Sequence, residues 1–344
     1  MDRKHFLGTL APLLAAGKGP LKNSVTEANL NFFKTSYTIP PYLKSGSVIG
    51  ITSPAGYTTL EEMQPALQVL QSWGYTIKIG TSIGKRDFTF GGTDDERLQD
   101  LQQMLDDKTI QAILCARGGY GSVRIVDRLN WKAFKKNPKW VIGFSDISVL
   151  HQHIHAQCRV ASLHSKMTNS FPDDWSKAEP IQVQAINSIF EALSGKQMQY
   201  TVTPNTCNQT GVAEGVLIGG NLKTMESLSG SASDINTAGK ILFVEDTGEY
   251  LYSIDRMFWN LARTGKLKHL AGLIVGGFNV KPDDEGEEFG KTITDIVLEK
   301  IKAYHYPVVF DFPVGHQRAN FALKCGVQHQ LKVTGEAALL TEII

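Results

Sequence analysis

The sequence predicts an α/β protein in two parts, an N-terminal domain on a parallel sheet and a β-rich C-terminal domain. From Gly46 onward, apolar strand-like segments alternate with segments whose apolar residues recur at helical spacing. Such alternation is typical of a parallel sheet covered by helices. After Tyr200 the apolar runs become shorter and glycines more frequent. The length of 344 residues suits about two domains of ordinary size.

The N-terminal elements can be placed in order. Apolar residues at helical spacing predict a helix over residues 60–70. Thr93 and Glu96 have the spacing of a capping box, which predicts the start of a helix that continues through Leu105. Short apolar runs predict four strands, at residues 47–52, 75–79, 110–116 and 140–142.

The alternation of strands and helices is interrupted by a polar stretch with a helical pattern over residues 172–195. We therefore predict a connector at 172–204 between an N-terminal domain at 39–171 and a C-terminal domain at 205–344. In the C-terminal domain the patterns predict strands at 212–218, 240–244, 273–275 and 308–310, and helices at 252–264 and 292–304.

Residues 1–38 form a leader with the layout of a secretory signal. Basic residues come first, and about a dozen apolar residues and then small residues follow. Arg3–Leu7 resembles a degenerate twin-arginine start. A periplasmic location is therefore favoured over a cytoplasmic one. The alternative is a short amphipathic leader, or a misassigned start, on a cytoplasmic enzyme.

Composition and spacing exclude several classes of function. The formal net charge of +1 gives no electrostatic case for a nucleic-acid partner. No segment after the leader has the about 20 apolar residues that a membrane-spanning helix needs. The four cysteines lack CxxC spacing, and His151, His153 and His155 would face different sides of a helix. We therefore expect no metal and no cofactor.

The most informative motif is the apolar strand that runs into Gly143, Phe144, Ser145 and Asp146. A serine at such a strand-to-helix turn exposes its hydroxyl beside the free amides of the helix start. That arrangement suits a nucleophile and a site for an oxyanion. The second half of the nucleophile-elbow signature is missing, because residue 147 is Ile rather than Gly. A serine that caps an ordinary helix is the alternative, and the motif alone favours it.

A serine nucleophile needs a base and a group that orients the base. His316 follows an apolar stretch and Gly315, where an imidazole could project into a cleft. A loop histidine bonded to backbone is the alternative. Glu245 and Asp246 end an apolar run, so either carboxylate could orient an imidazole or cap the next element.

Two glycine-rich turns follow predicted strands, at Thr52–Gly56 and Arg117–Gly121. Neither matches a dinucleotide-binding or Walker motif, so nucleotide binding is not indicated. Such turns are often only tight turns, but their bare amides could also form an oxyanion hole.

These motifs occur in one order with several others: Gly46–Gly56, Gly91–Arg97, Ala116–Arg124, Asn137–His151, Gly219–Leu222, Phe243–Asp246, Tyr252–Arg256 and Pro313–His316. Together they resemble the LD-carboxypeptidase family of serine peptidases, from Ile39 to the C-terminus. That family includes the murein tetrapeptide carboxypeptidases and the microcin C self-immunity peptidases.

The resemblance implies a Rossmann-like N-terminal domain and a β-rich C-terminal domain, with the active site between them. It also implies a homodimer that needs no metal. Ser145 matches the nucleophile, Glu245 the acid that orients the base, and His316 the general base. The backbone amides of Asp146, Gly118 and Gly119 would hold the oxyanion. Substrate contacts would come from Arg117, His164, Asn221 and Arg256.

The chain departs from the family pattern at two places. His164 is followed by Ser165, Lys166 and Met167, where the family usually has His-Gly-Pro-Met. This segment borders the cleft in relatives, so the details of substrate recognition stay open. The aromatic residue before the serine is Phe144 rather than the more common Tyr.

We therefore expect a serine carboxypeptidase that releases terminal D-alanine from murein stem tetrapeptides by hydrolysing an L,D amide bond. Its partner would be a small peptide or muropeptide. An alternative within the family is a peptidase that cleaves a peptide-nucleotide antibiotic or another acyl-amide conjugate. An alternative of another class is a periplasmic solute-binding protein, which needs no Ser, Glu or His at strand ends.

Overall fold

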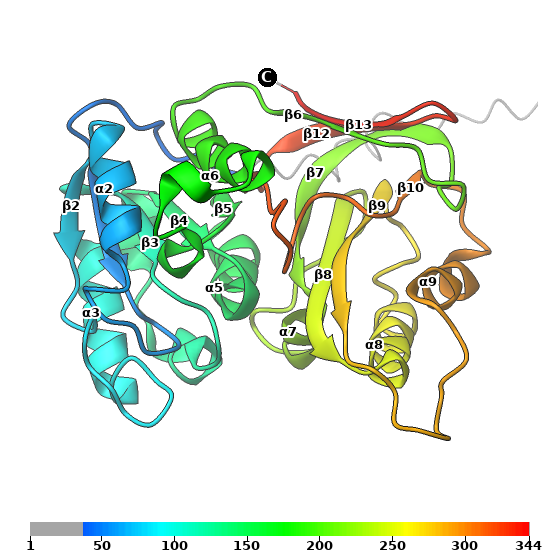
Figure 1. Ribbon diagram of the computed structural model, residues 1–344, viewed down its shortest axis with the longest axis horizontal. Coiled ribbons are helices and arrows are strands. Elements are labelled where there is room, and N and C mark those ends of the chain that lie inside the picture. Colours follow the sequence, from blue (N-terminus) through cyan, green and yellow to red (C-terminus); the bar gives the residue numbers. More distant parts are fainter. Residues whose placement is uncertain (1–36, 344) are drawn as a thin grey trace, which may run out of the picture. The chain divides into compact units, whose positions relative to one another are not determined.

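The first of two sheets has the strand order β11-β5-β4-β3-β1-β2, and Figure 1 labels its strands β2, β3, β4 and β5. Strands β1 to β5 pair in parallel, which confirms the predicted parallel sheet. Strand β11 comes from the C-terminal part of the chain and pairs antiparallel with β5 at the sheet edge. The members are β1 (Val48–Thr52), β2 (Thr76–Ile79), β3 (Ile110–Cys115), β4 (Trp140–Gly143), β5 (Ser162–His164) and β11 (Leu323–Cys325).

The computed structural model describes residues 37–343, which belong to one compact unit. The predicted leader lies outside the described residues, apart from Tyr37 and Thr38. Thr38 forms an isolated parallel bridge with Val160. No helix within the described range is long and apolar enough to cross a membrane.

Helices cover both faces of the first sheet. Adjacent residues of a strand point to opposite faces, and β3 shows the consequence. Leu114 packs in a core cluster with side chains of α2 and α6, whereas Ile113 packs in another with side chains of α3 and α5. These helices are α2 (Gln64–Ser72), α3 (Asp94–Asp106), α4 (Lys132–Lys136), α5 (Ser148–His153) and α6 (Pro180–Leu193). Shorter 3₁₀ or π turns lie at Ser122–Arg124, Val126–Arg128, Ser145–Ile147, Ile154–Cys158, Thr168–Ser170 and Trp175–Lys177.

Two predicted helix starts have different outcomes. The capping box at α3 is confirmed, because Thr93 and Glu96 each accept a hydrogen bond from the other's backbone N–H. The helix predicted over 60–70 begins later, at Gln64, because Pro65 suits the first turn of a helix, where its missing N–H is not needed. Leu60 is consequently left 47% exposed.

The second sheet has the order β10-β9-β8-β7-β12-β13-β6, and it confirms the predicted β-rich C-terminal part. Strands β7 to β10 pair in parallel, and β12, β13 and β6 continue the sheet in antiparallel pairs. The members are β6 (Gln199–Val202), β7 (Gly211–Asn221), β8 (Ile241–Glu249), β9 (Gly272–Val280), β10 (Val308–Val309), β12 (Gln328–Val333) and β13 (Ala338–Glu342).

The two sheets share one apolar core. Phe243 of β8 belongs to the same cluster as Leu163 of β5. The other face of β8, with Leu242 and Val244, packs against α7 (Leu222–Ser227), α8 (Leu251–Arg263) and α9 (Ile293–Ile301). Each such buried side chain contributes roughly 1.5–3 kcal/mol. The shared core thus joins β5 of the first sheet to the first half of β8 in the second.

Candidate active site

Ser145 follows β4 after one residue, Phe144, and is the first residue of the 3₁₀ turn Ser145–Ile147. Its φ is +62°, a left-handed conformation that residues other than glycine rarely adopt. A Cβ at Gly143 would come within 2.9 Å of Ile147, so the glycine allows the tight turn. Strained backbone of this kind costs about 1–3 kcal/mol and concentrates at functional sites. The conformation therefore supports a functional role for Ser145.

The Gly118–Gly119 turn lies beside this serine. A Cβ at Gly118 would come within 3.1 Å of Ser145 Cβ and 3.2 Å of its Oγ. Asp146 links the two turns, because its carboxylate accepts a hydrogen bond of 2.8 Å from Ser122 N. Burial raises the pKa of Asp146, and the hydrogen bonds from the Ser122 turn oppose this rise. The arrangement places bare backbone next to the hydroxyl.

Glu245 of β8 and His316, in the loop after β10, are in direct contact. Glu245 Oε2 lies 2.6 Å from His316 Nδ1. The carboxylate is fully buried, whereas 20% of the imidazole side chain is exposed. In the tautomer that carries its proton on Nδ1, His316 donates this hydrogen bond to the Glu245 carboxylate. The second ring nitrogen, Nε2, is then left to accept a proton from another group.

Gly315 permits this contact. Its φ is +101°, and a Cβ at this position would clash with the side chain of Glu245. The loop is fixed by two hydrogen bonds of 2.9 Å, from Gly315 N to Asn320 Oδ1 and from Gly277 N to Val314 O. Asn320 could not be predicted from the sequence, because nothing in its spacing marks it as a partner of the Gly315 backbone.

Phe144 connects the serine turn to the histidine loop. Its ring lies 4.9 Å from the ring of His316, and Ser145 follows it directly in the chain. The ring centre of His164 lies 5.9 Å from the ring centre of Phe144 and 4.9 Å from that of Phe243. His164 is fully buried, and burial holds its pKa well below the ordinary value. His164 is therefore a neutral ring that supports Phe144 from within the core.

Asp246 points to the other side of β8. Its carboxylate accepts hydrogen bonds from Asn221 Nδ2 at 3.0 Å and from Lys223 N at 2.9 Å. Burial raises its pKa to about 6. Asn221 also accepts a hydrogen bond from Thr224 N at 3.0 Å and so caps α7. The structure thus places Asn221, predicted to contact substrate, at a helix cap.

The two predicted substrate-binding arginines lie in different surroundings. Arg117 is exposed next to Gly118, and its Nη1 donates to Tyr57 O at 3.2 Å. Arg256 is exposed on α8, where its guanidinium lies 5.4 Å from the ring centre of Tyr252. The structure therefore places Arg117 in the turn beside Ser145 and Arg256 on the exposed side of α8.

Lys166 is a buried cation in the segment that departs from the family pattern. It is only 7% exposed, and its Nζ donates to Gln317 O at 3.3 Å, one residue after His316. Within residues 37–343, no carboxylate lies within 4 Å of this Nζ. Burial lowers the pKa of Lys166 to about 8. Neighbouring Met167 lies against the Gly118 turn.

We expect Lys166→Met to stabilise the protein at pH 7. The pKa of Lys166 falls from 10.5 to about 8 on folding, so the charged form is disfavoured in the folded state. This cost is fully present below pH 8 and disappears as the pH rises toward 10.5. The gain in unfolding free energy should be on the order of 3 kcal/mol at pH 7. Urea unfolding at pH 7 and pH 10 measures it; an equal gain at both values would contradict the explanation.

His151, His153 and His155 have separate partners, as their spacing predicts. Burial lowers the pKa of His151 to about 4 and that of His155 to about 3, so both rings are neutral. Their partners are Val141 O, Ser233 Oγ and Ser162 Oγ, respectively. In the described part of the chain, no group of His, Cys, Asp or Glu side chains could hold a metal ion.

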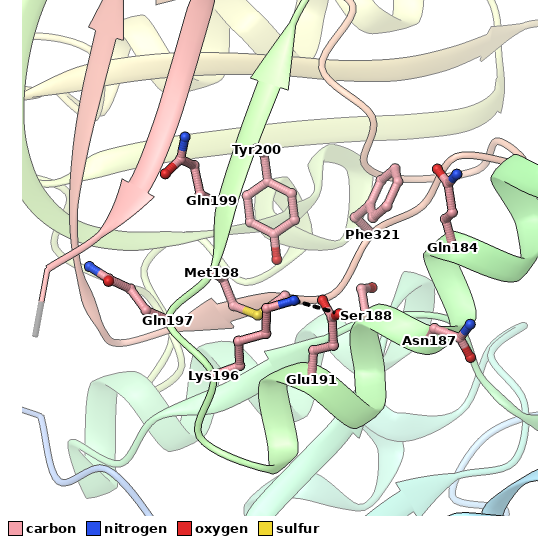
Figure 2. A pocket seen from close by; sticks show the side chains of 10 residues that line it. All are labelled: Gln184, Asn187, Ser188, Glu191, Lys196, Gln197, Met198, Gln199, Tyr200 and Phe321. Atoms are coloured by element: carbon pink, nitrogen blue, oxygen red, sulfur yellow. Dashed lines mark hydrogen bonds and ion pairs between the residues drawn. The ribbon is translucent and has the colours of Figure 1, made fainter.

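A pocket of about 590 Å³ between α6 and β6 contains none of the groups above (Figure 2). Figure 2 shows Tyr200 and Phe321 beside several amide side chains. Ser188 and Tyr200 already bond the backbone of Ala322, and Lys196 pairs with Glu191 at 2.6 Å. The polar side chains of Ser188, Tyr200, Lys196 and Glu191 thus already have partners, and neither Ser145 nor His316 lines this pocket.

Family models match two parts of the chain. Residues 49–165 match the LD-carboxypeptidase N-terminal domain, and residues 214–331 match the LD-carboxypeptidase C-terminal domain. The chain is 32% identical over 306 residues to a probable murein peptide carboxypeptidase of Bacillus subtilis, which covers 88% of this chain and 93% of the relative.

Two further proteins are similar over most of their length. The crystal structure of a muramoyltetrapeptide carboxypeptidase from Oxalobacter formigenes has a TM-score of 0.75 and 26% identity, and the match covers 86% of this chain and 98% of that one. The microcin C7 self-immunity protein of Escherichia coli is 25% identical over 333 residues, 87% of this chain and 94% of the relative. On the family matches and the identity to the Bacillus protein, this chain belongs to the LD-carboxypeptidase family of peptidases.

Proposed function

We propose that the protein is a serine carboxypeptidase that releases terminal D-alanine from murein stem tetrapeptides. The observation that carries the proposal is the buried Glu245 carboxylate, 2.6 Å from Nδ1 of His316, in a chain of this family. Phe144, the residue before the strained Ser145, packs against the same imidazole. The murein and muramoyltetrapeptide names of similar proteins support the substrate class.

In the proposed mechanism, Ser145 Oγ attacks the carbonyl carbon of the L,D amide bond. His316 Nε2 takes the hydroxyl proton and later gives it to the departing D-alanine nitrogen. Glu245 holds Nδ1–H and stabilises the imidazolium that forms. Water then attacks the acyl-enzyme, with His316 again acting as base, and restores Ser145.

The tetrahedral intermediate carries a negative oxygen that needs hydrogen-bond donors. We assign these donors to the backbone amides of Asp146 and of the Gly118–Gly119 turn. The close approach of Gly118 to Ser145 supports this assignment. Asp146 would contribute through its amide, since its carboxylate is already bonded to Ser122 N.

D-alanine release from defined peptides tests the proposal. Tetrapeptides with lysine or diaminopimelate at the third position, free or attached to the muramyl sugar, would be incubated with the protein and analysed by mass spectrometry. We expect loss of the terminal D-alanine and no cleavage of the same peptide ending in L-alanine. Binding of the tetrapeptide without any cleavage would support a solute-binding protein instead.

A peptide-nucleotide conjugate is the second candidate substrate. The similarity to the microcin C7 self-immunity protein favours it. Incubation with an aminoacyl sulfamoyl nucleoside would decide between the two. If its amide were cleaved with a much higher kcat/KM than the tetrapeptide, the second function would replace the first.

We expect exhaustive chelation to leave D-alanine release unchanged. The proposed base and acid belong to the chain itself, and triad chemistry requires no metal-bound water. Activity with and without a strong chelator, after dialysis, measures this. Loss of activity that zinc restores would contradict the mechanism.

Two further expectations concern assembly and location. We propose a homodimer, as the family resemblance implies, and light scattering of the purified protein would measure its mass.

We also favour export to the periplasm. Fractionation of cells that express the full-length chain would test it, and an intact leader on a cytoplasmic protein would contradict it.

A further inference from the structure

A pocket of about 430 Å³ lies beside the glycine turn that approaches Ser145. Three loops form it, around residues 56–57, 86–89 and 117–120. Its wall combines two cations with three aromatic rings: Tyr57, Arg86, Phe88, Arg117 and Tyr120, with Gly119 between them. The mechanism proposed above uses none of these side chains.

The pocket is connected to the serine by one short piece of backbone. Gly118 stands between two residues of the wall, Arg117 and Gly119. A Cβ on Gly118 would lie only 3.2 Å from Ser145 Oγ. Gly118 O also accepts a hydrogen bond of 2.9 Å from Gly56 N, which fixes two of the three loops together. The wall of the pocket is therefore continuous with the turn that approaches Ser145.

Both guanidinium groups are held in place and keep free donors. Arg86 Nε donates to Phe88 O at 2.9 Å, and its guanidinium lies 5.1 Å from the ring centre of Tyr57. Arg117 Nη1 donates to Tyr57 O at 3.2 Å. An arginine has five N–H donors, so most remain for a ligand. Across residues 37–343, neither arginine forms an ion pair with a carboxylate within 4 Å.

The carboxylate of Glu62 lies near enough to Arg117 for the guanidinium charge to affect its pKa. Hydrogen bonds from Thr59 and Thr58 lower the pKa of Glu62, and the charge of Arg117 lowers it further. Glu62 already accepts those hydrogen bonds, at 3.1 and 2.9 Å. Among residues 37–343 Glu62 forms no ion pair with Arg117, so the Arg117 donors other than the one bonded to Tyr57 O remain for a ligand.

Aromatic side chains at the rim are unusually exposed. Phe88 is 85% exposed and has a φ of +52°, although it is neither Gly nor Asn. Reciprocal hydrogen bonds between Asp87 and Phe90 hold it at the tip of this turn. Tyr120, on the facing loop, is 54% exposed. A large apolar side chain held in a strained turn toward solvent suits contact with a ligand.

We propose that this Arg86–Arg117 pocket binds a free carboxylate of the peptide substrate, while the rim aromatics pack on the adjoining peptide. The inference rests on the proposed function and adds the group that the enzyme recognises. Planar guanidinium groups bind carboxylates through paired, charge-assisted hydrogen bonds. A stem tetrapeptide offers this chemistry at its C-terminus, at the second residue and, with diaminopimelate, at the third.

Kinetics of Arg86→Gln and Arg117→Gln test the proposal, with Arg263→Gln as the control. Arg263 is an exposed arginine at the end of α8, outside the pocket. We expect kcat/KM for the tetrapeptide to fall about 10–100-fold in each pocket variant, mainly through KM, because a charge-assisted hydrogen bond is lost. The control should match wild type.

Three modified peptides identify the carboxylate: a C-terminal amide, a second-residue amide, and lysine in place of diaminopimelate. For the peptide that lacks the bound carboxylate, wild type and pocket variants should have equal kcat/KM. Pocket variants that match wild type on the unmodified peptide would overturn the inference and leave the proposed function standing. If the pocket variants lost kcat/KM equally on all three modified peptides, the inference would also be overturned.

If wild type released no D-alanine, the proposed function would fail, and binding would decide on the pocket. Calorimetry would compare the tetrapeptide and its amides on Ser145→Ala with and without Arg86→Gln. A weaker Kd that depends on one carboxylate supports the pocket. Equal binding by both proteins, or no binding, overturns it.

Discussion

Ser145→Ala is expected to abolish D-alanine release while leaving the fold and peptide binding intact. Without the hydroxyl there is no nucleophile for His316 to activate, and removing a triad serine typically lowers kcat by on the order of 10⁴-fold or more. Alanine keeps the Cβ of serine, so the left-handed backbone at φ +62° bears the same strain. Steady-state kinetics with the tetrapeptide, together with a thermal melt, measure both effects.

Ser72→Ala provides the control for the serine variant. Ser72 is an exposed serine at the end of α2 whose hydroxyl donates to Val69 O, and its loss should not change kcat. Other triad enzymes retain far less activity than about a tenth of wild type when the serine is removed. If Ser145→Ala kept more than that share of wild-type turnover, Ser145 would not be the nucleophile.

Glu245→Gln is expected to reduce kcat strongly, by about 10²–10⁴-fold on the scale of other triad acids. The amide keeps the shape of the carboxylate, but it removes the charge that stabilises the imidazolium and can donate to Nδ1. His316 would then turn or change tautomer while Ser145 stays in place.

Asp246→Asn should act differently, although it changes the neighbouring residue in the same way. Asp246 faces α7, where it accepts hydrogen bonds from Asn221 and from Lys223 N. Its amide would present an N–H₂ to one of these donors, so stability should fall while kcat changes little. Kinetics of both variants, with circular dichroism melts, distinguish the two roles. A large loss of kcat in Asp246→Asn with a mild effect in Glu245→Gln would reassign the acid by one residue.

Local patterns predicted most of the regular structure. The capping box at Thr93 and the alternation of strands and helices are short-range signals, and they gave the right elements in the right order. Pro65 moved the start of α2, although its preference for the first turn of a helix was visible in the sequence. Strand β11 could not be foreseen in the first sheet, because it pairs with β5 about halfway back along the chain.

The surroundings of the candidate site depend on such long-range contacts. Glu245 and His316 are 71 residues apart, and their contact needs Gly315 to pack against the carboxylate side chain. His164 follows the motif of a cleft residue, but packing of Phe144 and Phe243 on both sides encloses it. Asn221 lies in a family motif, and only the start of α7 shows that its side chain is a cap.

If Ser145 forms a covalent acyl intermediate, its hydroxyl should also react with a serine-directed active-site label. The protein would be treated with a fluorophosphonate, the fraction labelled would be followed by intact mass, and the labelled peptide would be sequenced by mass spectrometry. We expect a single adduct on Ser145 that accumulates in step with the loss of D-alanine release, and much slower labelling of Glu245→Gln. D-alanine release that persists in protein fully labelled at Ser145, or inactivation with the label on another residue, would contradict it.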